Sequence, residues 1–250
     1  MASFRESASD SFTVGSYKLA SLLAQLTPGP LAYATARLVG FTASASLQSR
    51  RDIIERHIRR VRPDFSKREV RAAVQGAFDS YARYYVESFR LPSLPREVVD
   101  ATFTLDGFER VLEGLAGGRG VILALPHLGG WEWAGRWMAD KGHRMTVIVE
   151  PLDPPELFEW FTDLRSSLGM NVVPLGPDAA SAVLSALRKN EIVCLLCDRD
   201  IQGGGVEVSF FGENTTLPAG PAMLGMRANA VVLPTAVYFT SKVDGHHAVI

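Results

Sequence analysis

Two residues have types and a spacing that suit acid–base chemistry: a histidine, His127, and a glutamate, Glu132. His127 follows the unbroken apolar run Val121–Leu125 and a proline, and it precedes two glycines and an apolar-rich segment. This order is typical of a buried strand, a tight turn and the start of a helix. His127 is therefore expected at the carboxyl end of a strand, where open α/β sheets bind their ligands. Glu132 is expected about one turn into the helix, facing back toward the histidine.

The pair suggests a base with an orienting carboxylate. A neutral imidazole can take the proton from an alcohol whose oxygen attacks a carbonyl, and a carboxylate on the other ring nitrogen fixes the tautomer. His127 and Glu132 fit those two roles, although a histidine at a strand end beside a glutamate is also a common structural pair. The sequence has no G-x-S-x-G motif and no exposed cysteine in a nucleophile context. Direct transfer to an acceptor hydroxyl is therefore favoured over a covalent acyl-enzyme.

Two further polar stretches are expected at the same rim of the sheet. Arg165 lies near the end of a predicted helix, and Asp198 and Arg199 follow a buried strand just before a run of three glycines. Arg165 could pair with Asp198, and either arginine could meet a phosphate or a developing oxyanion. Each of these charges could equally belong to a surface ion pair of little consequence.

The two cysteines, Cys194 and Cys197, are interpreted as structural. Their C-x-x-C spacing occurs in metal and redox sites, but they lie in the apolar run Ile192–Cys197, and residues three apart in a strand point to opposite faces. No second cysteine pair or histidine cluster in the sequence completes a metal site. We therefore expect no metal, and the absence of a disulfide framework fits a reducing compartment.

Length, charge and hydropathy set the broad class. With 250 residues, 47% of them hydrophobic, the chain can bury the core of one α/β domain with an N-terminal helical extension. A net charge of −1 argues against a protein that coats nucleic acid. No apolar run is long enough to cross a bilayer, and the first residues lack the basic start and apolar block of a secretory signal. The sequence thus predicts a cytoplasmic protein that meets a membrane, if at all, from the side.

Residues 1–48 are expected to form an amphipathic helical hairpin. Residues 11–47 are rich in Ala, Leu, Ser and Thr, with leucines at near-helical spacing, and Pro28-Gly29-Pro30 separates two helices, the second over Leu31–Leu47. A hairpin with so few charges could lie in a membrane interface or supply an apolar lip for a lipid site. A helix pair packed on the domain is the equal alternative.

A basic stretch follows the hairpin. Between Arg50 and Arg71 there are nine Arg or Lys residues against four acids, an excess of five positive charges. Such a patch suits an anionic leaflet, where each basic residue near the surface contributes about 1 kcal/mol, but a solvated helix face with internal ion pairs accounts for it equally well. The capping-box pattern of Ser66 and Glu69 then opens a helix whose aromatic stripe is interpreted as core.

The second predicted domain, residues 49–250, is α/β. From about Thr102, apolar strand-like segments alternate with helical ones, which indicates a mainly parallel sheet covered by helices on both faces. The strand pattern is still in progress at Ile250, so we expect further chain beyond it. The predicted strands are Ala101–Leu105, Val121–Leu125, Met145–Val149, Asn171–Pro174, Ile192–Cys197, Val206–Phe211 and Val231–Thr240, and the predicted helices are Gly107–Ala116, Gly130–Asp140, Pro155–Leu168, Asp178–Lys189 and Ala219–Ala228.

Several motifs occur in a consistent order between about residues 70 and 240. They are Ser80-Tyr81-Ala82-Arg83-Tyr84-Tyr85, Phe89-Arg90-Leu91-Pro92, Pro126-His127-x4-Glu132, Arg165-Ser166-Ser167-Leu168-Gly169, Asp198-Arg199-Asp200, Gly205-Val206-Glu207-Val208-Ser209-Phe210-Phe211-Gly212 and Thr216-Leu217-Pro218-Ala219-Gly220-Pro221-Ala222. This set resembles the bacterial lipid A biosynthesis (lauroyl/myristoyl) acyltransferase family, and within it most closely the actinobacterial phosphatidylinositol mannoside acyltransferases. An ordered set of motifs is far more specific than a lone histidine motif.

The resemblance implies a membrane-associated α/β acyltransferase that moves a fatty acyl chain from a thioester to a sugar hydroxyl of a glycolipid, here a mannose of a phosphatidylinositol mannoside. By position His127 matches the base and Glu132 its partner, while Arg165 and Asp198 match supporting polar residues. Arg199, next to Asp198, is expected from its position alone to be a further substrate contact. Mannoside enzymes often have Glu where this chain has Asp198, which is one methylene shorter.

The resemblance also implies the partners. The donor is acyl-CoA in the mannoside branch and acyl carrier protein in the lipid A branch, with no other cofactor, and the remaining partners are the glycolipid acceptor and a membrane surface. The expected location is peripheral, on the cytoplasmic face of the cell membrane. A thioesterase that uses the same pair to activate water, and a lipid-binding protein without catalysis, are the alternatives.

Overall fold

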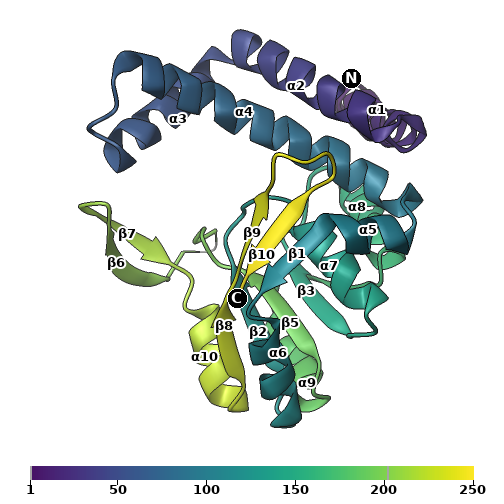
Figure 1. The fold of residues 1–250 in the computed structure, drawn as a ribbon, viewed down its shortest axis with the longest axis vertical. Coiled ribbons are helices and arrows are strands. Elements are labelled where there is room, and N and C mark those ends of the chain that lie inside the picture. The colour runs from purple at the N-terminus through teal and green to yellow at the C-terminus, as the bar shows by residue number, and fades with distance from the viewer. Residues whose placement is uncertain (1, 202) are drawn as a thin grey trace.

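The computed structural model describes residues 2–201 and 203–250, with side chains from Asp10 onward. An α/β body lies beneath a layer of long helices, as Figure 1 shows. The helical layer consists of α1 (Ala2–Leu26), α2 (Gly29–Ser46), α3 (Gln48–Val61) and α4 (Lys67–Arg90). The predicted break at Pro28 and the predicted α/β class are both confirmed.

The central sheet is parallel and has five strands in the order β4-β3-β5-β2-β8. Its middle strands β5 and β2 pair so that Leu125 lies opposite Leu196. His127 and Asp198 each come two residues after that last pair, so the register delivers both to the same edge of the sheet. The strands are β2 (Val121–Leu125), β3 (Met145–Val149), β4 (Met170–Pro174), β5 (Ile192–Leu196) and β8 (Val231–Pro234).

Helices cover both faces of this sheet, as the apolar strands predict. Successive residues of β2 point to opposite faces. Val121 and Leu123 face the cluster that contains residues of α6 (Phe108–Ala116) and α7 (Trp131–Asp140), whereas Ile122 faces the cluster formed with α9 (Ala179–Arg188) and α10 (Gly220–Ala228). A further helix, α8 (Pro155–Ser167), packs against β4 and α1.

Three predicted strands take a different place in the fold, and the one expected over Ala101–Leu105 lies outside the central sheet as β1. The single strand expected over Val231–Thr240 is divided after Pro234, and the chain passes at Thr235 from the central sheet into a second sheet of order β1-β10-β9. Proline has no N–H for a strand ladder, which favours a break there. The strand expected over Val206–Phe211 pairs with its successor in a separate hairpin. The bounds are β1 (Phe103–Asp106), β6 (Val206–Phe210), β7 (Glu213–Leu217), β9 (Ala236–Phe239) and β10 (His246–Val249).

Helix α4 is the element on which the other long helices pack. It begins with the predicted capping box, in which Ser66 and Glu69 bond to each other's backbone N–H groups. On α2, the small residues Ala32, Ala36 and Gly40 are buried and let the two helices approach closely, because a Cβ on Gly40 would lie 2.8 Å from the Cα of Asp79. Helix α4 ends at Arg90 and is followed by a 3₁₀ turn, Leu91–Ser93, and by α5 (Arg96–Thr102).

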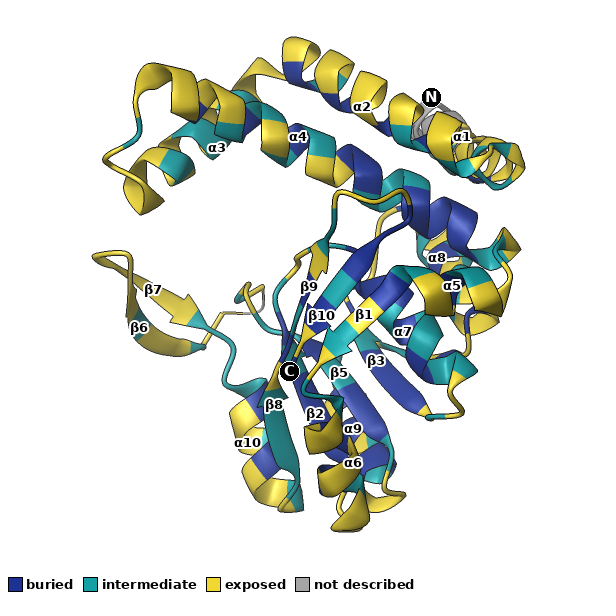
Figure 2. Cartoon of the chain, viewed as in Figure 1, coloured by how far each residue is buried: buried dark blue, intermediate teal, exposed yellow. Residues whose placement is uncertain are grey.

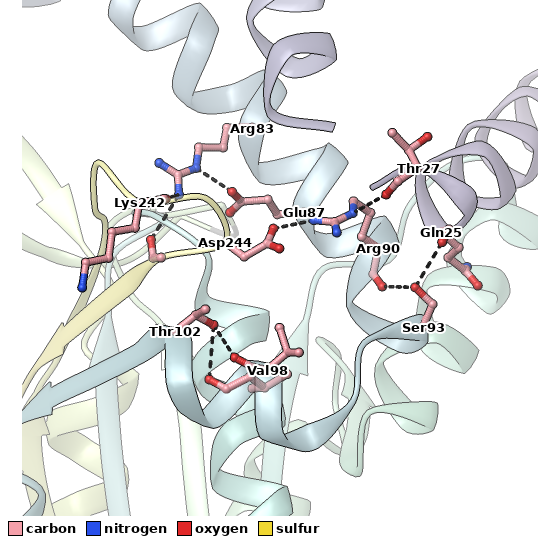
Figure 3. A network of polar contacts seen from close by, with 12 residues as sticks. Gln25, Thr27, Arg83, Glu87, Arg90, Ser93, Val98, Thr102, Lys242 and Asp244 are labelled. Atoms are coloured by element: carbon pink, nitrogen blue, oxygen red, sulfur yellow. Dashed lines mark hydrogen bonds and ion pairs between the residues drawn. The ribbon is translucent and has the colours of Figure 1, made fainter. Parts of the chain in front are cut away.

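Buried ionic contacts fix α4 to the turn between β9 and β10 (Figure 3). Arg83 pairs with Glu87 at 2.7 Å and donates hydrogen bonds to the carbonyl oxygens of Thr240, Lys242 and Gly245. About two turns further on, Arg90 forms an ion pair with Asp244. Figure 2 shows that α4 becomes buried toward this end. These contacts hold the helical layer in a fixed position over the α/β body, since breaking one would leave a buried charge unpaired.

Candidate active site

His127 and Asp198 form the polar pair at the carboxyl edge of the sheet. The Nδ1 atom of His127 lies 2.7 Å from Oδ1 of Asp198, and the backbone N–H of His127 donates to Oδ2 at 3.1 Å. The loops are held together because the backbone N–H of Cys197 donates to the carbonyl oxygen of Leu125 at 2.9 Å. Asp198 therefore accepts hydrogen bonds from both the ring and the main chain of His127.

The contact with Asp198 fixes the tautomer of the imidazole. Because a carboxylate accepts, Nδ1 carries the proton and Nε2 is left as the basic atom. Partial burial raises the pKa of Asp198, but the hydrogen bonds from His127 and its charge lower it by more, so the net pKa lies below the usual 3.8. The side chain of His127 is 42% exposed, so a substrate hydroxyl can reach the ring.

Glu132 lies apart from this pair, which corrects the expected geometry. Its side chain is only 3% exposed, and its Oε1 atom accepts hydrogen bonds from the hydroxyl of Tyr84 at 2.6 Å and from Nη2 of Arg165 at 3.1 Å. The expected pair of Arg165 with Asp198 is also wrong. The reason is register: Asp198 reaches His127 from the neighbouring strand, while the first turn of α7 directs Glu132 beneath the loop toward α4 and α8.

The buried cluster of Tyr84, Glu132 and Arg165 joins three helices. Burial lowers the pKa of Arg165, but the charge of Glu132 and the contact with Tyr84 raise it by more, so the guanidinium stays protonated. Burial, then the adjacent carboxylate of Glu132, raises the pKa of Tyr84 well above its usual value, so its hydroxyl remains a donor. The guanidinium also lies over the ring of Trp131, 4.9 Å from its centroid. We refer to Tyr84, Glu132 and Arg165 together as the ionic clamp.

The remaining predicted site residue, Arg199, is exposed in the loop after β5. That loop is closed by Asp200, whose Oδ2 atom accepts from the backbone N–H of Gly205 at 3.0 Å. The closure places the start of the β6–β7 hairpin directly beside the Asp198 loop.

Tyr84 is the site residue that the sequence pattern did not single out. It lies on α4 beside the stripe of Val70, Val74, Phe78, Tyr81, Tyr85 and Phe89 that the sequence predicts as core, and it is partly buried against the core. The signal that could have identified it is chemical, because a buried tyrosine hydroxyl needs a hydrogen-bond partner. The stripe is core at Phe78 but reaches the surface at Tyr81, which is largely exposed.

A small apolar void of about 20 Å³ lies between the central sheet and α7, close to the His127 loop. It is walled mainly by Leu, Val, Met and aromatic side chains, including Leu125 and Trp131, which flank the loop. Cys194 also lines it, and burial raises the pKa of that thiol to about 12. Both cysteines are free, and among residues 2–201 and 203–250 no group of three His, Cys, Asp or Glu side chains is arranged to hold a metal ion.

Residues 11–250 match the family model described as bacterial lipid A biosynthesis acyltransferase. The chain belongs to that family. The resemblance drawn from the motif around His127 and those that accompany it is thereby confirmed.

Relatives with curated names point to one branch of the family. A protein of Mycobacterium tuberculosis named phosphatidylinositol mannoside acyltransferase is 40% identical over 171 residues, which cover 66% of this chain and 54% of the relative. A protein of the same name from Mycolicibacterium smegmatis is 37% identical over 169 residues, which cover 66% of this chain and 56% of the relative. The chain thus spans about half the length of the curated relatives it matches.

Proposed function

We propose that this member of the family is an acyltransferase that moves a fatty acyl chain from acyl-CoA to a mannose hydroxyl of a phosphatidylinositol mannoside. The observation that carries the proposal is the contact of His127 with Asp198 at the carboxyl edge of the sheet, in a chain of this family. The names of the relatives support the choice of acceptor.

In this proposal His127 is the base and Asp198 orients it. Nε2 takes the proton from the sugar hydroxyl as its oxygen attacks the thioester carbonyl, and the imidazolium is stabilised by Asp198. When the tetrahedral intermediate collapses, the C–S bond breaks and the imidazolium returns the proton to the departing thiolate. The products are an acyl ester of the sugar and a free thiol, and the base is regenerated. Arg199, exposed beside Asp198, is the candidate contact for a phosphate of the donor or acceptor.

The apolar void under α7 has a volume of about 20 Å³, room for a single water molecule, so it belongs to the core and is not the site of the acyl chain. The buried Glu132–Arg165 pair supports Trp131, which directly follows the His127 loop, because the guanidinium packs over its ring. In this account Glu132 acts as a positioning residue.

The outer surface of α1 and α2 supports docking on a membrane from the side. On α2 the small residues face α4, while the large apolar ones point outward, with Leu38 64% and Phe41 63% exposed. A similar exposed set on α1 includes Phe12 and Leu26. No helix in the described part of the chain is both long and apolar enough to span a bilayer. An apolar surface of this kind fits burial at the interface of a leaflet.

The basic stretch lies next to this surface, on α3 and the start of α4. Arg59 pairs with Glu55 and Arg62 with Asp64, whereas Arg56 and others in the stretch are exposed without such pairs in the described chain. The free cations suit the anionic lipids of a cytoplasmic leaflet. We therefore place the protein peripherally on the cytoplasmic face of the cell membrane.

Product analysis tests the proposal. The protein is incubated with palmitoyl-CoA, or with palmitoyl acyl carrier protein, and phosphatidylinositol mannoside, and the lipids are identified by mass spectrometry. The proposal expects an acyl ester on mannose with palmitoyl-CoA as donor. An ester formed only with the carrier protein would correct the donor. Free fatty acid as the sole product would favour the thioesterase alternative, which the exposure of His127 to solvent makes chemically feasible.

A further inference from the structure

The β6–β7 hairpin stands out from the body of the protein. Within the described part of the chain its two strands pair only with each other, and Figure 2 shows them exposed over most of their length. An isolated two-stranded hairpin has little core of its own and is marginally stable in water. Side chains at its tip therefore contribute little to the packing of the domain.

The tip of this hairpin carries two exposed aromatic residues. Phe210 is 56% exposed and Phe211 is 53% exposed, and their rings meet edge to face with centroids 4.7 Å apart. The apolar character continues along one face, since Val206 and Val208 alternate with polar residues and lie on the same side of the strand as Phe210. Two large apolar side chains at the end of a projecting hairpin are a costly exposure in water unless something covers them.

The backbone conformation at the tip does not favour an aromatic residue at Phe211. Phe211 and Gly212 are the central residues, and both have positive φ, 49° and 78°. Such turns favour Asn or Gly at the first position, because a side chain with a bulky ring is strained in the left-handed region. A phenylalanine at this position lowers the stability of the turn, which points to a role for its ring outside the domain.

An ion pair places the tip beside the basic helix. Arg60, near the end of α3, lies 3.0 Å from Glu213, the first residue of β7. The pair neutralises Glu213 at the tip, and Arg60 belongs to the basic stretch of α3. The other acid of the hairpin, Glu207, is paired in register with Thr216, away from the tip. In Figure 1 the hairpin projects from the α/β body on the side of α3, with its tip toward that helix. Aromatic side chains flanked by cations are suited to an anionic bilayer.

We propose that the β6–β7 tip is a second membrane anchor, in which Phe210 and Phe211 insert into the anionic leaflet that the basic stretch of α3 contacts. This rests on the membrane docking in the proposed function and extends it to a segment next to the chemistry. The hairpin follows the Asp198 loop, to which Asp200 and Gly205 tie it. An anchored tip keeps the exposed imidazole of His127 near the lipid surface, where a glycolipid acceptor presents its sugar.

A double variant tests the anchor without disturbing the fold. In Phe210→Ser/Phe211→Asn the asparagine suits the left-handed backbone, so thermal stability is expected to stay level or rise. Sedimentation with vesicles of phosphatidylcholine and phosphatidylglycerol should show at least about a tenfold loss of partition, because two aromatic side chains no longer insert. The matched control is Met223→Ser/Met226→Ser, which removes two exposed apolar side chains from α10 and is expected to leave the partition unchanged.

The outcomes separate the anchor from the docking on which it rests. If the wild-type protein binds and the double variant binds within twofold of it, the anchor is refuted while the docking of α1–α3 stands. If the wild-type protein does not bind at all, both are refuted. A double variant that keeps vesicle binding but loses concentration-dependent self-association would overturn the inference in favour of a second copy of the chain as the occupant. Equal losses in the double variant and the α10 control would also overturn it, because the effect would then be general to exposed apolar residues.

Discussion

The Nδ1 atom of His127 lies 2.7 Å from the carboxylate of Asp198, and the two side chains meet because Leu125 and Leu196 are paired in register on neighbouring parallel strands. The partner of the imidazole therefore comes from across the sheet, 71 residues away in sequence. Glu132, which is close in sequence, is occupied by Tyr84 and Arg165.

Asp198→Asn is expected to lower the rate of acyl transfer by about 10²–10⁴, because an amide at this position can hold the imidazole in the wrong tautomer. Steady-state rates with palmitoyl-CoA and glycolipid acceptor would measure the loss. Asp198→Glu, which restores the charge with one more methylene, should recover part of the rate. A full rate in Asp198→Asn would remove Asp198 from the mechanism.

The pH dependence of stability should show the lowered pKa of Asp198. A carboxylate whose pKa is lowered on folding contributes stability above its unfolded value, usually 3.8, and loses that contribution as the pH falls through the folded value. The difference in Tm between the wild-type protein and Asp198→Asn should be level between about pH 5 and 7 and should shrink below about pH 4. A difference that grows as the pH falls would contradict the assigned contact.

Breaking the ion pair between Glu132 and Arg165 should lower the stability of the fold more than it lowers the rate of transfer. Arg165→Met leaves the buried carboxylate of Glu132 without its cation, which is expected to destabilise the fold by about 3–5 kcal/mol. Tyr84→Phe removes one hydrogen bond to the same oxygen and should cost about 1–3 kcal/mol. Urea denaturation checks both values. If Arg165→Met keeps its full stability and loses only the rate, the arginine acts directly on the substrate.

The sequence was most informative where neighbouring residues decide the structure. The predicted bounds of β2 and β3 agree with the structure, since buried parallel strands are continuous apolar runs. The capping box at Ser66 is likewise predictable from the sequence, because all of its groups lie within one helical turn. His127 was placed correctly at a strand end for the same reason.

Contacts between distant segments were beyond the reach of sequence spacing. The spacing of Glu132 from His127 suggested a pair, but strand register brought Asp198 to the imidazole instead. The run Val231–Thr240 looked like one strand because apolar residues continue on both sides of Pro234, although its halves join different sheets. The exposed apolar faces of α1 and α2 were open alternatives in the sequence because burial depends on which helix packs where.

Replacing the outward apolar residues of α2 should weaken membrane binding without unfolding the protein. Leu38→Ser/Phe41→Ser removes two side chains that are mostly exposed and is expected to lower partition into anionic vesicles at least about tenfold, with Tm little changed. Leu112→Ser on α6 is the control, being an exposed leucine on the α/β body. Raising the salt concentration should release the wild-type protein in part, since the docking is partly electrostatic. If neither the substitutions nor the salt changes partition into the vesicles, α2 and α3 do not contact the membrane.

The transfer rate of His127→Ala is the most direct test of the mechanism. Labelled palmitoyl-CoA and phosphatidylinositol mannoside are supplied to the wild-type protein and to the variant, and the formation of the mannose ester is followed over time, with circular dichroism as a check on folding. The folded variant is expected to form the ester about 10²–10⁴-fold more slowly, since that is the usual contribution of a general base. Ester formation at the wild-type rate in folded His127→Ala would contradict this expectation.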